Sequence, residues 1–457
     1  MPRITGLLVS LLLITLNVPL LINPAPNNEF AIVDSRFSKN LERENDFRWV
    51  QLFDNMMARH PQSFTECQAG GYVVTGFIIE SAIGLGDEHA WMAKINEVGE
   101  VTWERVYLSE HRGWGHAVTE CDNGDLVVVG AVDDEFSNVL VFRTDRVGNL
   151  LWERILNFTE HQEAYAVIEL PSQDLIVCGW AWHYRPTNPV DGLVISLNSD
   201  GSLNWHREYG GLGDEYLYSV TEDPSQGLVF VGSTESLYDN TVRMWVVNTD
   251  FNGTVKWERT FGNSGYSRGN CIIITDIGEF TLAGVIQDMS TSQLDSYVVH
   301  IDPDGTELWV QQLSLGTDNI AHCITTCSDG GYAMIGEVSH SENNPWHDII
   351  VVRFDRDGHI LWQKVYGEEG NDIGISIVEC REGDLVFAGS TSSYGFLSGT
   401  TWLTQIPDAP PPPVDPRRVD LALTLIGLAL ALIVLAVTGG IYFVSRREIK
   451  HRIRDSA

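Results

Sequence analysis

Positively charged residues are scarce in this sequence. Its 457 residues include 29 Lys and Arg against 62 Asp and Glu, which gives a formal net charge of −33 at pH 7. A surface of this sign repels phosphate backbones, so we expect no nucleic-acid partner. The sequence also lacks an H-E-x-x-H pair, a C-x-x-C pair and a P-loop, and with them the sites that depend on these motifs. We therefore predict no catalytic, cofactor-binding or metal-binding residues, and no cofactor.

Two further absences concern the fold. No stretch between residues 47 and 406 shows sustained helical periodicity, so this part should be all-β. A disulfide framework is not expected, although Cys67, Cys121, Cys327 and Cys380 recur at one position of a repeat. Equivalent positions in different repeats should stay outside the roughly 7 Å Cα separation that a disulfide requires. We interpret these residues as small residues at strand ends, with metal ligation as the alternative.

A repeat of about 50 residues is the dominant feature of the chain. Each unit has four short strand-like runs, which we call strands A to D in chain order. In the fifth unit these runs are GNCIIITD, EFTLAG, DSYVVHID and LWVQQL. The marker of the repeat is the motif Asp/Asn-x-x-Gly-x-x-x-Trp between strands C and D. It begins at Asn96, Asp145, Asn198, Asp250, Asp302 and Asp355.

The motif predicts a tight turn with a docked tryptophan. In the fifth unit, the carboxylate of Asp302 can accept hydrogen bonds from the turn amides that follow it. Gly305 supplies the positive φ of a tight hairpin, and Trp309 can fill the wedge between neighbouring sheets. The D-x-D-G forms at 302–305 and 355–358 also resemble calcium-binding turns, which is the alternative interpretation.

The number of strands predicts how the repeat closes. Seven A–B hairpins each end in Gly, at positions 76, 130, 179, 232, 284, 336 and 389, whereas the C–D motif occurs six times. The missing seventh motif is divided between TTWLTQI at 400–406 and FRWVQLF at 47–53. Pairing of these two strands would close a ring and leave no open sheet edge. The sequence therefore predicts a seven-bladed β-propeller over residues 47–406.

The six C–D motifs, such as IDPDGTELW and FDRDGHILW, resemble the tryptophan-docking repeats of the quinoprotein dehydrogenase superfamily. The runs DGGYAMIG and LWQKVYG are also similar to Gly-rich propeller repeats of archaeal and bacterial surface proteins. The resemblance covers roughly residues 47–406 and implies the fold. Quinoprotein enzymes typically have eight blades and adjacent cysteines; this chain has seven units and no Cys-Cys pair, so the resemblance does not imply the quinone cofactor.

Both ends of the chain differ in composition from the repeat region. Residues 1–26 have a basic start and an apolar run, as in a signal peptide or N-terminal anchor, and 27–46 form a linker. Residues 407–420 are a proline-rich stalk. An uncharged segment that begins at Leu421 and ends at Val444 predicts a transmembrane helix. The basic tail 445–457 should be cytoplasmic, so we expect a single-pass membrane protein with an extracellular propeller.

Connections between strands predict where a partner binds. The A–B and C–D turns share one face of the ring, the tight-turn face. The B–C and D–A connections share the other, the long-connection face, where binding residues are usually displayed. Two B–C segments, 179–191 and 336–348, are rich in aromatic residues. Their candidate contact residues are Trp180, Trp182, His183, Tyr184, Arg185, His340, Trp346 and His347. The alternative is that these aromatic residues pack between blades.

Two sequons, which begin at Asn157 and Asn252, are possible glycosylation sites in an exported domain. Together these features predict a membrane-anchored binding, adhesion or scaffold module whose partner is an extracellular glycan or surface protein. The first alternative is an extracytoplasmic hydrolase or lyase with a site at the mouth of the central channel. The second alternative is a structural element of the cell envelope.

Overall fold

The computed structural model describes residues 47–53, 58–79, 87–108, 111–134, 136–184, 189–223, 227–236, 241–262, 265–341, 344–393 and 399–408. The predicted N-terminal segment, linker, transmembrane helix and cytoplasmic tail lie outside these residues, as does the stalk beyond Asp408. Within the described stretches, no helix is long and apolar enough to cross a bilayer.

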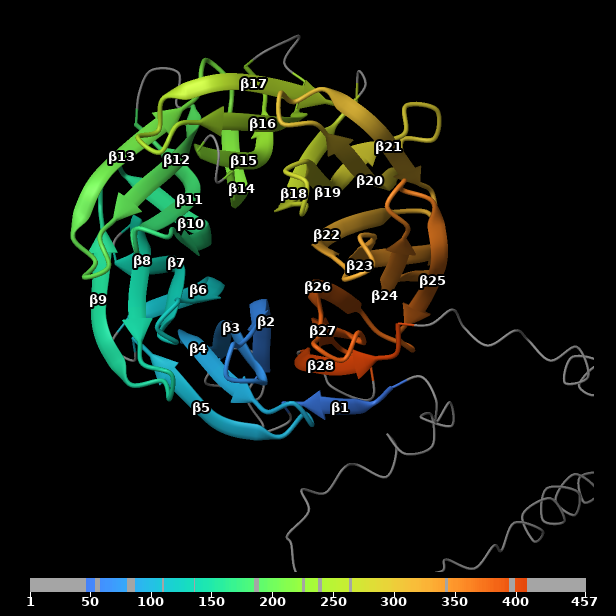
Figure 1. The fold of residues 1–457 in the computed structure, drawn as a ribbon, viewed down its shortest axis with the longest axis horizontal. Coiled ribbons are helices and arrows are strands. Elements are labelled where there is room, and N and C mark those ends of the chain that lie inside the picture. The colour runs from blue at the N-terminus through green and yellow to red at the C-terminus, as the bar shows by residue number, and fades with distance from the viewer. Residues whose placement is uncertain are drawn as a thin grey trace, which may run out of the picture. The chain divides into compact units, whose positions relative to one another are not determined.

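The described residues form seven antiparallel sheets of four strands each, arranged around a central axis (Figure 1). Strand A of every sheet lies nearest the axis and strand D lies outermost. The first three blades comprise β2 (Ala58–Glu66), β3 (Tyr72–Ile79), β4 (Glu88–Ile95) and β5 (Val101–Tyr107); β6 (Arg112–Glu120), β7 (Leu126–Asp134), β8 (Phe136–Thr144) and β9 (Leu150–Leu156); and β10 (His161–Glu169), β11 (Leu175–Trp182), β12 (Val190–Leu197) and β13 (Leu203–Tyr209).

Blades 4 to 6 follow the same plan. They comprise β14 (Glu215–Asp223), β15 (Gly227–Thr234), β16 (Arg243–Thr249) and β17 (Val255–Phe261); β18 (Ser267–Ile274), β19 (Phe280–Gln287), β20 (Leu294–Ile301) and β21 (Glu307–Leu313); and β22 (Asn319–Thr326), β23 (Tyr332–Ser341), β24 (Asn344–Phe354) and β25 (Ile360–Tyr366). The prediction of an all-β, seven-bladed propeller is confirmed.

Blade 7 is assembled from both ends of the repeat region. It comprises β26 (Asp372–Glu379), β27 (Leu385–Thr391), β28 (Thr400–Ile406) and, as its outermost strand, β1 (Trp49–Leu52). β1 pairs antiparallel with β28 in a register that places Trp49 opposite Gln405 and Leu52 opposite Trp402. The predicted closure of the ring is therefore confirmed.

Hydrophobic packing joins neighbouring blades. In one cluster, Val129 and Val141 of blade 2 pack with Val177 and Ile195 of blade 3, and all four side chains are buried. Strands B and C carry apolar residues on both faces of each sheet, and each face packs against a neighbouring blade. This explains why every residue of β12 and β15 is buried.

The C–D turns have the structural role that the sequence predicts. The carboxylate of Asp302 accepts hydrogen bonds from the backbone N–H groups of Asp304 and Thr306, at 3.0 and 2.8 Å. Gly305 has a φ of +79°. The same pair of carboxylate-to-amide bonds recurs at Asp145, Asp250 and Asp355.

In six of the seven blades, the tryptophan of strand D docks on the turn glycine of the next blade. A Cβ atom on Gly305 would lie 2.9 Å from the indole of Trp257, so only glycine leaves room for the ring. The arrangement recurs for five more pairs: Trp49 and Gly99, Trp103 and Gly148, Trp152 and Gly201, Trp205 and Gly253, and Trp309 and Gly358. The prediction that these tryptophans fill the wedge between sheets is confirmed.

Blade 6 has no complete C–D turn beside it, and Asp408 takes that place. The carboxylate of Asp408 accepts hydrogen bonds from Trp362 Nε1 at 3.1 Å and from Arg353 Nε at 2.9 Å. The Arg353 side chain is almost fully buried, and its Nη2 also lies 2.8 Å from Asp329. The chain is therefore held to blade 6 where it leaves the ring on the tight-turn face.

One expected loop is largely strand. The segment 336–348 was expected to be a long B–C connection, but β23 continues to Ser341 and β24 begins at Asn344, with these two residues paired. His340 therefore lies in β23, and Trp346 and His347 lie in β24. The B–C connection of blade 2 is similarly short, because β7 ends at Asp134 and β8 begins at Phe136.

Tryptophan docking can be separated from turn geometry by comparing two glycines. Gly305 and Gly278 both have positive φ, but a Cβ on Gly278 would meet no atom within 4 Å. We expect Gly278→Ala to lower the free energy of unfolding by about 1 kcal/mol through backbone strain alone. Gly305→Ala should cost an additional amount of about 1–3 kcal/mol because the methyl group displaces Trp257. Equal losses in denaturant unfolding would contradict the docking argument.

Closure of the ring generates a second prediction. Deletion of residues 47–53 should expose the edge of β28 and the apolar surface beneath it, and the protein should aggregate or unfold at a markedly lower temperature. Thermal unfolding followed by light scattering measures both effects. A deletion variant that melts like the parent would show that β1 contributes nothing to closure.

Candidate functional site

Each strand A carries a β-bulge at the same repeat position. In β6, for example, the register shifts between Gly115 and Ala117, which leaves His116 unpaired. A bulge can turn the side chain of the extra residue in a new direction. In this ring the side chains of the bulged residues face the axis. The seven bulged residues form what we call the bulge ring: Gln62, His116, Tyr165, Tyr218, Asn270, His322 and Ile375.

All seven residues of the bulge ring line one cavity of about 430 Å³, which we call the channel cavity. His60, Pro61, Arg268, Ile373 and Ser390 complete its wall. His60, Arg268 and Ile373 precede the bulges by two residues, and strands A begin at the long-connection face. The cavity is therefore the half of the channel that lies towards that face.

Aromatic rings dominate the part of the wall contributed by blades 2 to 4. The His116 and Tyr165 rings are stacked at 5.0 Å, and Tyr165 lies 5.4 Å from Tyr218. Tyr218 in turn stacks on Tyr216 at 6.0 Å, and the Arg268 guanidinium lies 5.2 Å from the Tyr218 ring centroid. This wall combines flat apolar faces with a cationic group.

The aromatic residues predicted in the segment 179–191 continue this wall outwards. Trp180 Nε1 donates to the Tyr165 hydroxyl at 3.4 Å, and the Trp180 ring packs on Tyr216 of the next blade at 6.2 Å. Trp180 therefore packs between blades, as the alternative interpretation held. Trp182 contacts Tyr184, which is 78% exposed, at 6.3 Å. Arg185 lies outside the described residues.

The second predicted segment reaches the cavity from blade 6. Glu337 is buried between His322 of the bulge ring and His347, with N–O distances of 3.6 Å to each. Burial alone would raise the pKa of Glu337, but the hydrogen bond and charge of His322, together with His347, lower it. Trp346 is 45% exposed beside them. Both predicted segments therefore contact the wall of one cavity: the segment 179–191 contacts Tyr165, and the segment 336–348 contacts His322.

Hydrogen bonds between blades orient two members of the bulge ring. His116 Nδ1 lies 3.0 Å from the Ala164 carbonyl oxygen, and Asn270 Nδ2 donates to the Ala321 carbonyl at 2.8 Å. Burial lowers the pKa of His116, although the charge of Glu163 acts in the opposite direction. Burial also lowers the pKa of His60. Burial raises the pKa of Tyr165, Tyr218 and Tyr216, the last to about 12, so the tyrosine hydroxyls stay protonated at neutral pH.

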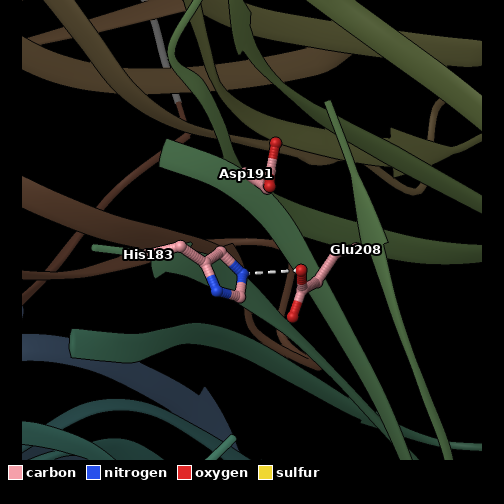
Figure 2. A group of neighbouring side chains, drawn as sticks. All are labelled: His183, Asp191 and Glu208. Carbon is pink, nitrogen blue, oxygen red and sulfur yellow. Dashed lines mark hydrogen bonds and ion pairs between the residues drawn. The ribbon is translucent and has the colours of Figure 1, made fainter. Parts of the chain in front are cut away.

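A group of three possible metal ligands lies on the long-connection face of blade 3 (Figure 2). His183 follows β11, Asp191 belongs to β12 and Glu208 belongs to β13, and their ligand atoms lie within 4.8 Å of one another. A histidine with two carboxylates suits a divalent cation such as Zn²⁺. His183 Nε2 also forms a 2.7 Å hydrogen bond with Glu208, which orients both side chains without an ion.

The group Asp355, Asp357 and His359 differs, because the Asp355 carboxylate already accepts the amides of its own turn. A G-x-S-x-G match at 265–269 is not a nucleophile elbow either. Ser267 is fully buried at the start of β18, donates to the Phe261 carbonyl at 2.9 Å and accepts from the Met244 N–H at 3.0 Å. Both predicted sequons begin at exposed asparagines, Asn157 and Asn252.

Sequence reasoning missed the bulge ring. Its members differ in chemistry from blade to blade, so no motif reveals them. The available signal was positional: each lies five residues before the repeat position of Cys67, Cys121, Cys327 and Cys380. Because successive side chains of a strand point to opposite sides, the place of this position within strand A could have identified it as one that faces the axis.

No protein family model matches the sequence, and neither does any curated protein. Among solved structures, the Pan2 WD40 domain of Neurospora crassa is 10% identical with a TM-score of 0.48, over 77% of this chain and 90% of that one. YCF48 bound to D1 peptide is 9% identical, with a TM-score of 0.47 and coverages of 79% and 95%. A glucose dehydrogenase is 8% identical, with a TM-score of 0.41 and coverages of 78% and 98%. At these identities the likeness concerns the fold alone.

The lowered pKa of His116 predicts a specific pH dependence. Between pH 7.5 and 5.5 the unfolded chain takes up a proton at this residue that the folded protein resists, so stability falls as the pH falls below about 6.5. His116→Asn should keep the bond to Ala164, as Asn270 keeps its bond to Ala321, and should remove this part of the loss. The effect is below about 1.4 kcal/mol per pH unit. Parallel stability–pH curves for parent and variant would contradict it.

Proposed function

We propose that this protein is a membrane-anchored extracellular propeller that binds a glycan at the mouth of its channel. The supporting observation is the channel cavity, where stacked tyrosine and histidine rings stand beside amide and guanidinium groups of Gln62, Asn270 and Arg268. Sugar rings stack on aromatic faces, and their hydroxyl groups need polar partners of this kind. A surface protein is the alternative ligand, engaged mainly through Tyr184 and Trp346.

The proposed ligand carries an acidic group. The cavity wall contains Arg268, and His60, His116 and His322 surround the same space. A guanidinium over an aromatic face is suited to pair with a carboxylate or sulfate. In a chain with a net charge of −33, a guanidinium on the cavity wall favours a uronic acid or sulfated sugar. Burial lowers the pKa of His60 and His116, so at neutral pH these two rings offer hydrogen-bonding groups and not positive charge.

The proposed anchoring agrees with the path of the chain. β28 ends at Ile406 on the tight-turn face, and Asp408 is held to blade 6 there. If residues 421–444 span the membrane, as we propose, the channel cavity opens on the side of the ring opposite the anchor. The cavity is then accessible to polymers outside the cell.

An extracytoplasmic hydrolase or lyase is the second candidate function. The observation that favours it is the convergence of titratable groups at the channel mouth: His60, His116, His322, Glu163 and Glu337. General acid–base catalysis requires such groups within reach of one substrate. An enzyme would shorten the bound glycan, whereas a binding protein would release it unchanged.

The test is a glycan array probed with the full-length protein in nanodiscs, including uronic acid and sulfated polymers. We expect Tyr218→Ala to weaken binding about tenfold, because the variant loses a stacking surface in the cavity. Phe251→Ala is the matched control, since Phe251 is an exposed aromatic residue in a C–D turn on the tight-turn face. Unfolding temperatures check that both variants fold.

Equal affinities of the parent and Tyr218→Ala would overturn the assignment of the cavity. Binding of proteins but of no glycan on the array would select the alternative ligand. Mass spectrometry of each glycan after incubation distinguishes the second candidate function, because only an enzyme produces shorter chains.

A further inference from the structure

A ring of small residues follows the bulge ring directly. Its members are Ser63, Ala117, Ala166, Ser219, Cys271, Cys323 and Ser376. Blades 5 and 6 both place cysteine at this position, and the two sulfur atoms lie 3.6 Å apart. The four cysteines at the strand-end repeat position are free, as expected, but this second repeat position beside the axis brings two sulfur atoms of neighbouring blades close together.

Hydrogen bonds between side chains of one blade and the backbone of the next hold the two cysteines close together. The Ile324 N–H of blade 6 donates to Cys271 Sγ at 3.5 Å, as the Ile272 N–H donates to Ser219 Oγ at 3.3 Å one blade earlier. Asn270 directly precedes Cys271, and its Nδ2 donates to the carbonyl of Ala321, two residues before Cys323, at 2.8 Å. The two strands are thus held together on either side of the thiols, and the S–S approach does not depend on a side-chain rotamer alone.

The pair differs chemically from the other five cysteines. Cys67, Cys121, Cys178, Cys327 and Cys380 are buried, and burial raises the pKa of each of these thiols. Cys271 and Cys323 are partly exposed. A hydrogen bond from Cys271 lowers the pKa of Cys323 to about 7, and the pKa of Cys271 is raised correspondingly. Cys323 is therefore the more readily ionised thiol of the pair.

We propose that Cys271 and Cys323 form a disulfide that links blades 5 and 6 across the channel wall. A small disulfide such as cystine is the oxidant. The Cys323 thiolate attacks one of its sulfur atoms, forms a mixed disulfide and releases one thiolate. Cys271 then loses its proton and attacks Cys323 Sγ, which displaces the second thiolate. Two protein thiols are oxidised by two electrons, and the oxidant is reduced to two thiols.

The geometry needs only a small adjustment. The sulfur atoms must move from 3.6 Å to about 2.05 Å apart, which side-chain rotation in two neighbouring strands can supply. The link would close a loop from residue 271 to residue 323 and add a covalent bond near the axis between two blades that the chain joins through residues 314–318. We expect the unfolding temperature to rise by roughly 3–6 °C.

The experiment exposes the native full-length protein in nanodiscs to cystine and maps its cysteines without reduction. Cleavage after Glu279 and Glu307 separates Cys271 from Cys323. The expected result is a loss of two mass units, a Cys271–Cys323 cross-linked peptide and the higher unfolding temperature, all reversed by a reductant. Cys178→Ser should behave like the parent, and Cys327→Ser should keep the cross-link, because Cys327 shares a peptide with Cys323.

Single variants test the order of attack. Cys271→Ser should accumulate a mixed disulfide on Cys323 at neutral pH, whereas Cys323→Ser should react several-fold more slowly at Cys271. A native parent that remains fully reduced, or that keeps a stable mixed disulfide on Cys323 without cross-linking, would overturn the proposal. A disulfide between any other pair would overturn it as well. None of these outcomes depends on which ligand the channel binds.

Discussion

The fold depends on one contact that is repeated around the ring: the indole of one blade lies on the turn glycine of the next. The contact requires three residues together, because the aspartate or asparagine shapes the turn, the glycine leaves space and the tryptophan fills it. The hydrophobic core lies between sheets, so each blade needs a neighbour on both sides to bury its faces. Docking sets the spacing at which these faces meet.

Because the outer contacts hold the blades in place, the inner residues are free to differ. The seven bulged residues occupy one structural position, yet they include histidines, tyrosines, amides and an isoleucine. The cavity wall is consequently asymmetric, with aromatic rings on the side of blades 2 to 4 and, on blade 6, His322, which is paired with Glu337 behind it. Asymmetry of this kind is how a repetitive scaffold acquires a specific site.

The sequence predicted the outer part of the molecule well and the inner part poorly, for a physical reason. Asp302, Gly305 and Trp309 each serve one dominant requirement that recurs, so their spacing reveals the turn, the repeat and the closure by β1. The bulged residues serve a site that exists once, so they have no common chemistry to detect. His183 follows β11, and Asp191 and Glu208 lie in two further strands, so only the register of the sheet brings the three together. The residue types in 336–348 do not reveal how far β23 and β24 extend, which is why this segment was expected to be a loop.

The attachment of Asp408 has a mechanical consequence. Tension applied to the chain beyond this residue reaches the carboxylate before it reaches β28, because Asp408 is bonded to Trp362 and Arg353 of blade 6. Arg353 is buried and anchored in turn to the Tyr332 and Phe354 carbonyls, so the load spreads into two strands of an intact sheet. Among the described strands, β1 and β28 are the one pair of neighbours in a sheet that does not follow consecutively in the chain. The bonds of Asp408 protect this pair from a pulling force that would otherwise break its hydrogen bonds in sequence.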